Sequence, residues 1–278
     1  MGRKEAFEQY RDASGNPQFA ESCVLFFDLL GVSAMAQDPD ALTYLNQLRP
    51  ALEQASERAG TDDAGQTHAS TWFTDNVVVA TPVFRFPQDQ EGALLFTIVN
   101  VSYLFLILLE RGFLGRGGIG FGDHYMDDRF VFGPALIAAA ELEKNTKQPR
   151  IALTEDAAQL AAKVATTSGY GQSMKVPHVR ALAIDLADQT VFVDTFGLWL
   201  AEEDDDELAE YLLEKHRQGI ENGIRSTAGD PKVQDKWLWL ADYFNWSIKA
   251  YGERKPSALV TSAPGTYEFV YFFEVLSW

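Results

Sequence analysis

The chain has 278 residues, 46% of them apolar, and a formal net charge of −17. That length and apolar content suffice to bury one large core, whereas the acidic surplus argues against duplex nucleic acid or an anionic membrane as the main partner, because neutralising phosphates needs clustered Lys and Arg. A single cysteine, Cys23, excludes an intrachain disulfide and a cysteine zinc site. The polar N-terminus, without an apolar signal segment, predicts a cytoplasmic protein.

The predicted elements begin after a polar stretch over residues 1–20, which we expect to be a loose lead-in. Ser22–Leu30 has the apolar run of a buried strand, and Gly31 ends it. The elements predicted next are a helix from Asp38 to about Arg58, a strand over Ser70–Val83, a helix over Glu91–Arg111, a glycine-rich strand over Arg116–Asp123 paired with Arg129–Phe132, a helix over Pro134–Lys144, a strand over Arg150–Leu153, a helix over Thr154–Ala165, and a hairpin of Ala181–Leu186 with Val191–Phe196.

The composition changes after Trp199. An acidic run over 202–207 begins a helix to about Ser226, where its charges complement the helix dipole and face solvent. A second helix follows Pro231 and is rich in Trp and Tyr; helical spacing favours core or subunit packing over stacking on nucleic-acid bases. A last strand over Tyr267–Phe273 closes a sheet or an interface.

The segment Gly92–Leu109 is almost wholly apolar and close to the length of a membrane span. An acidic stretch precedes it, and a further strand follows within a few residues. We therefore expect a helix buried against a sheet or a partner subunit, with no membrane insertion.

Two aspartates stand inside apolar runs, Asp28 in Phe26–Gly31 and Asp75 in Trp72–Val79. An ionised carboxylate is costly to bury unless it is paired, hydrogen-bonded or bound to metal. Taken singly, each placement has a structural explanation: Asp28 would end its strand in a turn, and Asp75 would pair with a buried arginine. Two strands that bring both carboxylates together would instead make a site for Mg²⁺ or Mn²⁺, which prefer oxygen ligands and bind phosphate substrates.

A literal G-x-G-x-x-G occurs at Gly115, Gly117 and Gly120. The dinucleotide fingerprint needs a strand before it and a helix after it, whereas here a predicted helix precedes the glycines and a polar turn follows. Glycines inside a strand instead indicate close approach of another backbone or a ligand.

Together these segments resemble the class III nucleotide cyclase family, most closely its bacterial pyrimidine cyclase branch, which acts in antiphage signalling. The resemblance covers roughly Glu21–Phe196. It depends on F-x-D-x-x-G at Phe26, Asp28 and Gly31, F-T-D-N at Phe73–Asn76, R-x-G-I-x-x-G at Arg116, Gly118, Ile119 and Gly122, and V-F-G-P-A-L at Val131–Leu136.

The resemblance implies an α+β fold: a cyclase-like, ferredoxin-type βαββαβ core with helices packed on a mostly antiparallel sheet, plus a helical C-terminal extension. It divides the chain into a lead-in over 1–20, a catalytic domain over 21–199, and an aromatic-rich extension over 200–278 that packs on the core or on a dimer interface.

The resemblance also implies roles for residues. Asp28, Asp75 and the Leu29 carbonyl would bind two Mn²⁺ or Mg²⁺ ions per active site, and Arg116 would join the two aspartates in catalysis. The implied nucleotide-binding residues are Phe26, Leu29, Leu30, Gly31, Val32 and Thr71. Family members are homodimers with active sites between the subunits.

Departures from the purine-cyclase pattern bear on the substrate. Thr71 stands where adenylate cyclases carry a base-reading Lys, and Ile137 and Glu141 stand where their catalytic helix carries Asn and Arg. We therefore expect a different base and another cation at the phosphate. The candidates for that cation are Arg116, Lys144 and Arg150.

The leading hypothesis is a lyase that converts UTP to 3',5'-cyclic UMP and pyrophosphate, as a messenger for a separate effector protein in antiviral defence. Cytidylate cyclase, acting on CTP, is the near alternative. A catalytically inactive cyclase-like sensor that binds nucleotide is a rival from another class, and a metal-dependent nucleotidyltransferase or polymerase-like palm is a third.

Overall fold

The computed structural model describes residues 7–58, 69–73, 75–83, 90–167, 181–203, 205–251 and 259–276. The elements are β1 (Ala20–Leu29), α2 (Val32–Gln37), α3 (Ala41–Arg58), β2 (Ala69–Phe73), β3 (Asn76–Pro82), α4 (Gln90–Glu110), β4 (Gly115–Met126), β5 (Val131–Phe132), α5 (Pro134–Asn145), β6 (Ile151–Leu153), α6 (Glu155–Thr167), β7 (Leu182–Asp185), β8 (Thr190–Val193), α7 (Thr195–Glu202), α8 (Asp206–Ser226), α9 (Pro231–Tyr251), β9 (Phe269–Tyr271) and α10 (Phe272–Leu276).

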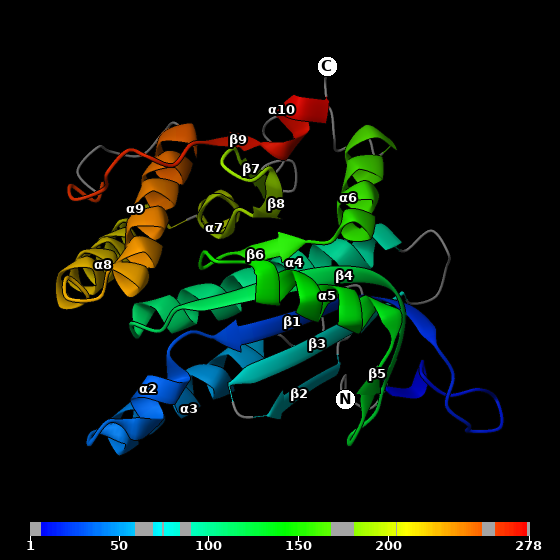
Figure 1. Ribbon diagram of the computed structural model, residues 1–278. Coiled ribbons are helices and arrows are strands. Elements are labelled where there is room, and N and C mark those ends of the chain that lie inside the picture. The colour runs from blue at the N-terminus through cyan, green and yellow to red at the C-terminus, as the bar shows by residue number, and fades with distance from the viewer. Residues whose placement is uncertain are drawn as a thin grey trace.

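The described strands form one sheet in the order β2-β3-β1-β4-β6-β8-β7-β9, with β5 paired to β4 (Figure 1). The elements β1, α3, β2, β3, α4 and β4 follow one another as βαββαβ, and their strands lie in the order β2-β3-β1-β4. Strand β1 is antiparallel to both β3 and β4, whereas β4 and β6 are parallel. The predicted α+β fold with a ferredoxin-type core and a mostly antiparallel sheet is confirmed.

The two faces of this sheet are covered differently. Alternate residues of β1, such as Leu25 and Phe27, pack in the main core with α3 and α4, while Val24 belongs to a second cluster with Ala135 of α5. In Figure 1, α4 lies behind the sheet and α5 in front of it. Each face of β1 therefore contacts a different helix layer, as the strict alternation of strand side chains requires.

Helix α5 approaches β4 so closely that the strand must be glycine there. A Cβ at Gly118 would lie 2.2 Å from the carbonyl oxygen of Ala139, and one at Gly120 would lie 2.3 Å from that of Ala135. Both distances are well inside van der Waals contact. The expectation that the strand glycines indicate close backbone approach is confirmed.

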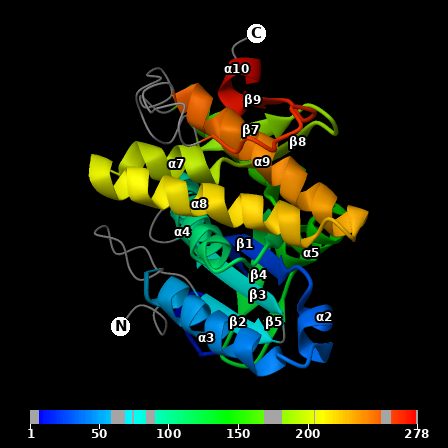
Figure 2. The same ribbon diagram turned by 90° about the vertical axis from the view of Figure 1, so that its left-hand side faces the viewer.

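Helix α4 is buried, as expected. Among the described residues it is the one helix long and apolar enough to cross a membrane, and 67% of its most apolar window is buried inside the protein. It contacts β1 and β3 on one side and α3, α6, α7 and α8 on others. Figure 2 shows α8 and α9 lying across α4 and the sheet.

The C-terminal elements complete the sheet as well as covering it. Strand β9 pairs with β7, and the aromatic side chains of α9 pack on Phe192 of β8 and Phe269 of β9. The core packing predicted for the aromatic helix is therefore confirmed. The division of the chain at residues 20 and 199 stays a prediction.

Three local expectations are wrong. Ser70–Val83 is not one strand: β2 and β3 pair as a hairpin, so Asp75 lies in its turn. The strand expected to continue to Phe196 ends at Val193, because Asp194 caps α7 by accepting a hydrogen bond from the Gly197 N–H. The N-terminal stretch is not loose throughout, because Tyr10 is fully buried and its hydroxyl lies 3.0 Å from Ser22 Oγ.

Candidate active site

Asp28 lies near the C-terminal end of β1, between two neighbouring strands. It faces Asn76 of β3 on one side and Arg116 of β4 on the other. Residues paired across strands point to the same face of a sheet, so these three side chains form a row on the face that carries α5. The side chain of Asp28 is 19% exposed.

Asp75 is placed beside this row by the hairpin turn. The Leu29 N–H donates a 3.0 Å hydrogen bond to the Asp75 carbonyl, and the Asn76 amide donates one of 3.0 Å to Asp75 Oδ1. The two aspartates therefore lie at the same end of adjacent strands. The structure brings them together through a turn rather than through two strand interiors.

Arg116 is held by three oxygen partners. Its Nε lies 2.5 Å from Glu143 Oε1 of α5, one terminal nitrogen lies 3.5 Å from Asp28 Oδ2, and another donates a 2.8 Å hydrogen bond to the Thr146 carbonyl. A guanidinium bound on three sides has little freedom to rotate. Arg116 therefore presents a fixed positive charge beside Asp28.

Burial and neighbouring negative charges disfavour the ionised forms of Asp28 and Glu143. Burial raises the pKa of Asp28 above its ordinary value; Arg116 opposes that rise and Asp75 adds to it. Burial likewise raises the pKa of Glu143, against Arg116 and with contributions from both aspartates. Further positive charge at this place would stabilise the ionised forms of Asp28 and Glu143.

The donor set fits a hard divalent cation. Carboxylate oxygens of Asp28 and Asp75, with a backbone carbonyl nearby, are ligands that Mg²⁺ and Mn²⁺ accept. Within the described residues, no group of three or more His, Cys, Asp or Glu side chains converges on one point. Any ion held by the two aspartates would therefore take its remaining oxygens from backbone, water or substrate phosphates.

The turn after β1 supplies backbone rather than side chains to the site. The Leu29 side chain is 3% exposed and points into the main core. Gly31 adopts the left-handed conformation, with φ 86°, immediately before α2 begins at Val32, a conformation that glycine takes without steric cost. Leu30 and Val32 are half-buried and pack on the main core.

Thr71 and Phe26 lie one row further along the same face. Val78 of β3 pairs with Thr71 on one side and with Phe26 on the other, so all three side chains point to the face of Asp28. Both Thr71 and Phe26 are half-buried. Of the residues expected at the nucleotide, Thr71 and Phe26 thus lie on the same face of the sheet as Asp28.

Two of the three basic residues expected at the substrate phosphate lie away from Asp28. Arg150 is buried in a different ion-pair group, 2.5 Å from Asp185 and also paired with Asp188, and Lys144 is exposed on α5. Ile137 and Glu141 are exposed too. Arg116 is the candidate that the structure places beside Asp28.

Glu143 is a site residue that the sequence reasoning missed. It shares the buried side of α5 with Ala135 and Ala139, at spacings of four residues. This four-residue spacing places Glu143 on the same buried face of the helix as the two alanines. A charged residue on a buried helical face needs a partner, so the spacing could have indicated a role for Glu143.

Comparisons with known proteins leave the function open. No protein-family model matches the chain, and no characterised protein matches its sequence. Among solved structures, the chain is similar to the crystal structure of the adenylyl cyclase CyaB from P. aeruginosa, with 16% identity and a TM-score of 0.43 over 63% of this chain and 93% of that one. A likeness this distant assigns neither an activity nor the role of any residue.

Proposed function

We propose that this protein is a pyrimidine nucleotide cyclase that converts UTP to 3',5'-cyclic UMP and pyrophosphate. The observation that carries the proposal is the placement of Asp28 and Asp75 at the same end of adjacent strands in a βαββαβ core, with Arg116 beside them. The sequence resemblance supplies the reaction class, and the clustered carboxylates supply a place for the divalent ions it requires.

In this role Asp28, Asp75 and the Leu29 carbonyl hold two Mg²⁺ or Mn²⁺ ions. Such ions, when bound, lower the pKa of the ribose 3'-hydroxyl and neutralise charge on the leaving pyrophosphate. The 3'-hydroxyl would lose its proton to water, and its oxygen would bond to the α-phosphorus while the bond from that phosphorus to pyrophosphate breaks. The backbone N–H groups of Gly31 and Val32 bind the triphosphate, because those of Leu29 and Leu30 already donate to the carbonyls of Asp75 and Leu114. Arg116 stabilises charge that develops on the α-phosphate.

The choice of uracil comes from the sequence resemblance, and the small Thr71 side chain is compatible with either pyrimidine ring. Thr71 and Phe26 offer a small hydroxyl and a ring on the face of Asp28. A hydroxyl can donate to or accept from either pyrimidine, so CTP as substrate, giving cyclic CMP, remains the near alternative. A cytoplasmic homodimer with active sites between subunits, whose product signals to a separate antiviral effector, belongs to the same proposal.

A catalytically inactive nucleotide sensor is the second candidate. Arg116 already pairs with Asp28 and Glu143, so a protein cation stands where a metal would act. Ile137 and Glu141 also occupy the positions of the Asn and Arg of purine cyclases, and both are exposed. A sensor would bind nucleotide with metal and release it unchanged.

The test is incubation of the purified protein with each of the four ribonucleoside triphosphates and Mn²⁺, with products identified by mass spectrometry. Asp75→Ala removes one carboxylate of the site, and Asp156→Asn, on the exposed start of α6, is the matched control. Cyclic UMP formed by wild type and control but not by Asp75→Ala is the expected result. Cyclic CMP alone would reassign the base, metal-dependent binding without turnover would favour the sensor, and linear linked nucleotides would overturn the cyclase.

A further inference from the structure

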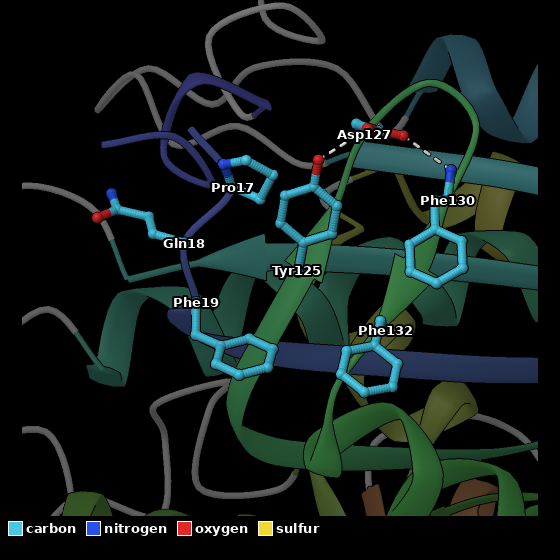
Figure 3. Close-up of a pocket in the computed structure, with 7 residues that line it drawn as sticks. All are labelled: Pro17, Gln18, Phe19, Tyr125, Asp127, Phe130 and Phe132. Carbon is cyan, nitrogen blue, oxygen red and sulfur yellow. Dashed lines mark hydrogen bonds between the residues drawn. The ribbon is translucent and has the colours of Figure 1, made fainter. Parts of the chain in front are cut away.

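A second feature lies toward the other end of β4, away from the aspartates. There the β4–β5 hairpin and the N-terminal stretch surround a hollow of about 420 Å³ (Figure 3). Its lining is mostly apolar and comes from Pro17, Gln18, Phe19, Tyr125, Asp127, Phe130 and Phe132. Small-molecule sites have volumes of this order, with apolar walls and a few fixed polar groups.

Three phenylalanine rings form one wall of the hollow. The ring centroids of Phe19 and Phe132 are 6.1 Å apart with an angle of 21° between planes, and those of Phe130 and Phe132 are 6.1 Å apart with an angle of 19°. The three residues are 49%, 58% and 52% exposed in the order Phe19, Phe130, Phe132. Figure 3 shows Phe130 and Phe132 beside Tyr125, around the same space.

A carboxylate is fixed at the rim of this aromatic wall. Asp127 Oδ1 accepts backbone hydrogen bonds of 2.8 Å from Arg129 and Phe130, and Oδ2 accepts one of 2.7 Å from the Tyr125 hydroxyl. The backbone hydrogen bond from Arg129 and the hydroxyl of Tyr125 hold the pKa of Asp127 below its ordinary value. The carboxylate is therefore ionised at neutral pH and cannot turn away without breaking the turn.

We propose that this hollow binds a small organic cation of the quaternary or alkylated ammonium class. Aromatic faces carry negative partial charge and attract cations, most strongly those that are weakly hydrated. The rim carboxylate of Asp127 adds a full negative charge, and the phenylalanine faces contact the alkyl groups that an inorganic ion lacks. The charge of the whole chain, −17, favours a cationic ligand over an anionic one.

Arg11 supplies the opposing charge near the hollow. Its guanidinium is close enough to contribute to lowering the pKa of Asp127, and it donates a 3.2 Å hydrogen bond to the Gly15 carbonyl. A cationic ligand must bind against this repulsion. Removal of the Arg11 charge should therefore tighten binding of a cation and leave binding of a neutral molecule unchanged.

The hollow is distinct from the candidate active site. Tyr125 follows Arg116 by nine positions on β4, which is roughly 30 Å along an extended strand. The proposal therefore does not depend on the proposed cyclase activity. Either can fail while the other holds.

The test is calorimetric titration of the full chain with choline and with its uncharged tert-butyl analogue. Asp127→Asn removes the charge but keeps an oxygen acceptor for the turn, Phe130→Leu removes one ring and keeps an apolar side chain, and Arg11→Gln removes the opposing charge. Tyr211→Leu, at a 55% exposed ring on α8, is the control for loss of an exposed aromatic elsewhere. Unfolding curves establish that each variant is folded.

We expect choline to bind wild type about 10-fold more tightly than the neutral analogue, because charge over aromatic faces is the source of affinity. Asp127→Asn should remove that preference, Phe130→Leu should weaken choline about 10-fold, Arg11→Gln should tighten it, and Tyr211→Leu should change nothing. Equal binding of the two ligands, or absence of choline binding by folded wild type, would overturn the proposal. Self-association of wild type that Phe130→Leu abolishes, without choline binding, would identify the hollow as a contact between copies and equally overturn it.

Discussion

The backbone N–H of Leu29 donates a 3.0 Å hydrogen bond to the carbonyl of Asp75, which joins the end of β1 to the β2–β3 turn. Asp28 is the residue before Leu29, so one backbone contact sets the relative positions of both carboxylates. Side-chain flexibility alone could not keep them together, because like charges separate when they are free to move. This contact is the structural basis for treating the pair as one site.

Asp28→Asn should remove metal binding while leaving the fold intact. Asp28 Oδ2 lies 3.5 Å from the Arg116 guanidinium, and Arg116 keeps its closer partner, Glu143, at 2.5 Å in the variant, so we expect the loss of the Asp28 charge to change the free energy of unfolding little. We expect Mn²⁺ affinity to fall by at least about 100-fold, as for loss of a direct ligand, and unfolding free energy to change by less than about 1 kcal/mol. Electron paramagnetic resonance of Mn²⁺ and urea unfolding measure the two effects. Unchanged Mn²⁺ binding with strong destabilisation would show that Asp28 serves only to pair Arg116.

Glu143→Gln should weaken both the fold and metal binding. The change removes the carboxylate 2.5 Å from Arg116 Nε, and the guanidinium then pairs more fully with Asp28, in competition with metal. We expect a loss of about 1–3 kcal/mol in unfolding free energy and about a 10-fold weaker Mn²⁺ affinity. Glu141→Gln, on the exposed side of the same helix, is the control. Equal behaviour of the two variants would contradict a role for Glu143.

Arg150→Met should lower stability without changing activity, whereas Arg116→Met should lower activity. Arg150 is 2% exposed and pairs with Asp185, which also accepts a 2.8 Å hydrogen bond from the Trp239 indole. Removing it leaves a buried carboxylate unpaired, so we expect a loss of about 3–5 kcal/mol in unfolding free energy but unchanged kcat for folded protein.

Arg116→Met should instead lower kcat about 100-fold, because that charge faces the proposed phosphate position. Calorimetric unfolding and product formation at a temperature where both variants are folded separate the effects. An Arg150 variant that is stable but inactive would reverse the assignment.

Gly118→Ala should displace α5. The added Cβ would lie 2.2 Å from the Ala139 carbonyl oxygen, and backbone cannot yield as a flexible side chain can. We expect a loss of about 1–3 kcal/mol, with weaker Mn²⁺ binding because Glu143 moves with the helix. Gly229→Ala is the control: no described atom lies within 4 Å of the position that its Cβ would take, so its effect should stay within about 0.5 kcal/mol. Similar unfolding midpoints for both would contradict the close approach.

Acid should destabilise the protein through its buried histidines. Burial lowers the pKa of His216 to about 4, and that of His124 also to about 4. The unfolded chain binds these protons near pH 6.5 and the folded chain does not, so stability is lost as pH falls from about 6.5 to about 4. Each histidine contributes on the order of 3 kcal/mol across that window.

His216→Phe should reduce the dependence of the unfolding free energy on pH, because a phenyl ring does not titrate. Urea unfolding at pH 7, 6 and 5 measures it. A wild-type stability that is flat over this range would show that these imidazoles are protonated in the folded protein.

The sequence predicted elements best where one pattern acted alone. The apolar run of β1 and the longer apolar run of α4 each predicted the observed element, since burial on both faces of a strand or around a helix follows from a continuous apolar run. Gly118 and Gly120 predicted close packing because a strand interior otherwise disfavours glycine.

The sequence-based predictions were wrong or incomplete where a turn, or a contact with a residue distant in the chain, determines the structure. Apolar residues on both sides of Asp75 concealed the hairpin, because neither Gly nor Pro interrupts the run. Glu143 was missed because its role depends on Arg116, which lies on β4 and is 27 positions earlier in the chain. The resemblance predicted the two aspartates as a pair, and local patterns predicted the helix over 134–144, but neither could show that this helix brings Glu143 to Arg116.

The burial of α4 has a consequence for synthesis of the chain. Helix α4 ends at Glu110, whereas α8, which covers part of it, ends at Ser226, more than 100 residues later. At about 5–20 residues per second, translation leaves the apolar helix without that cover for roughly 6–23 s. During that interval the nascent chain presents a surface typical of chaperone clients and of membrane-inserted segments. A shortened gene that stops at codon 199 would make this transient exposure permanent, and its product should aggregate rather than fold.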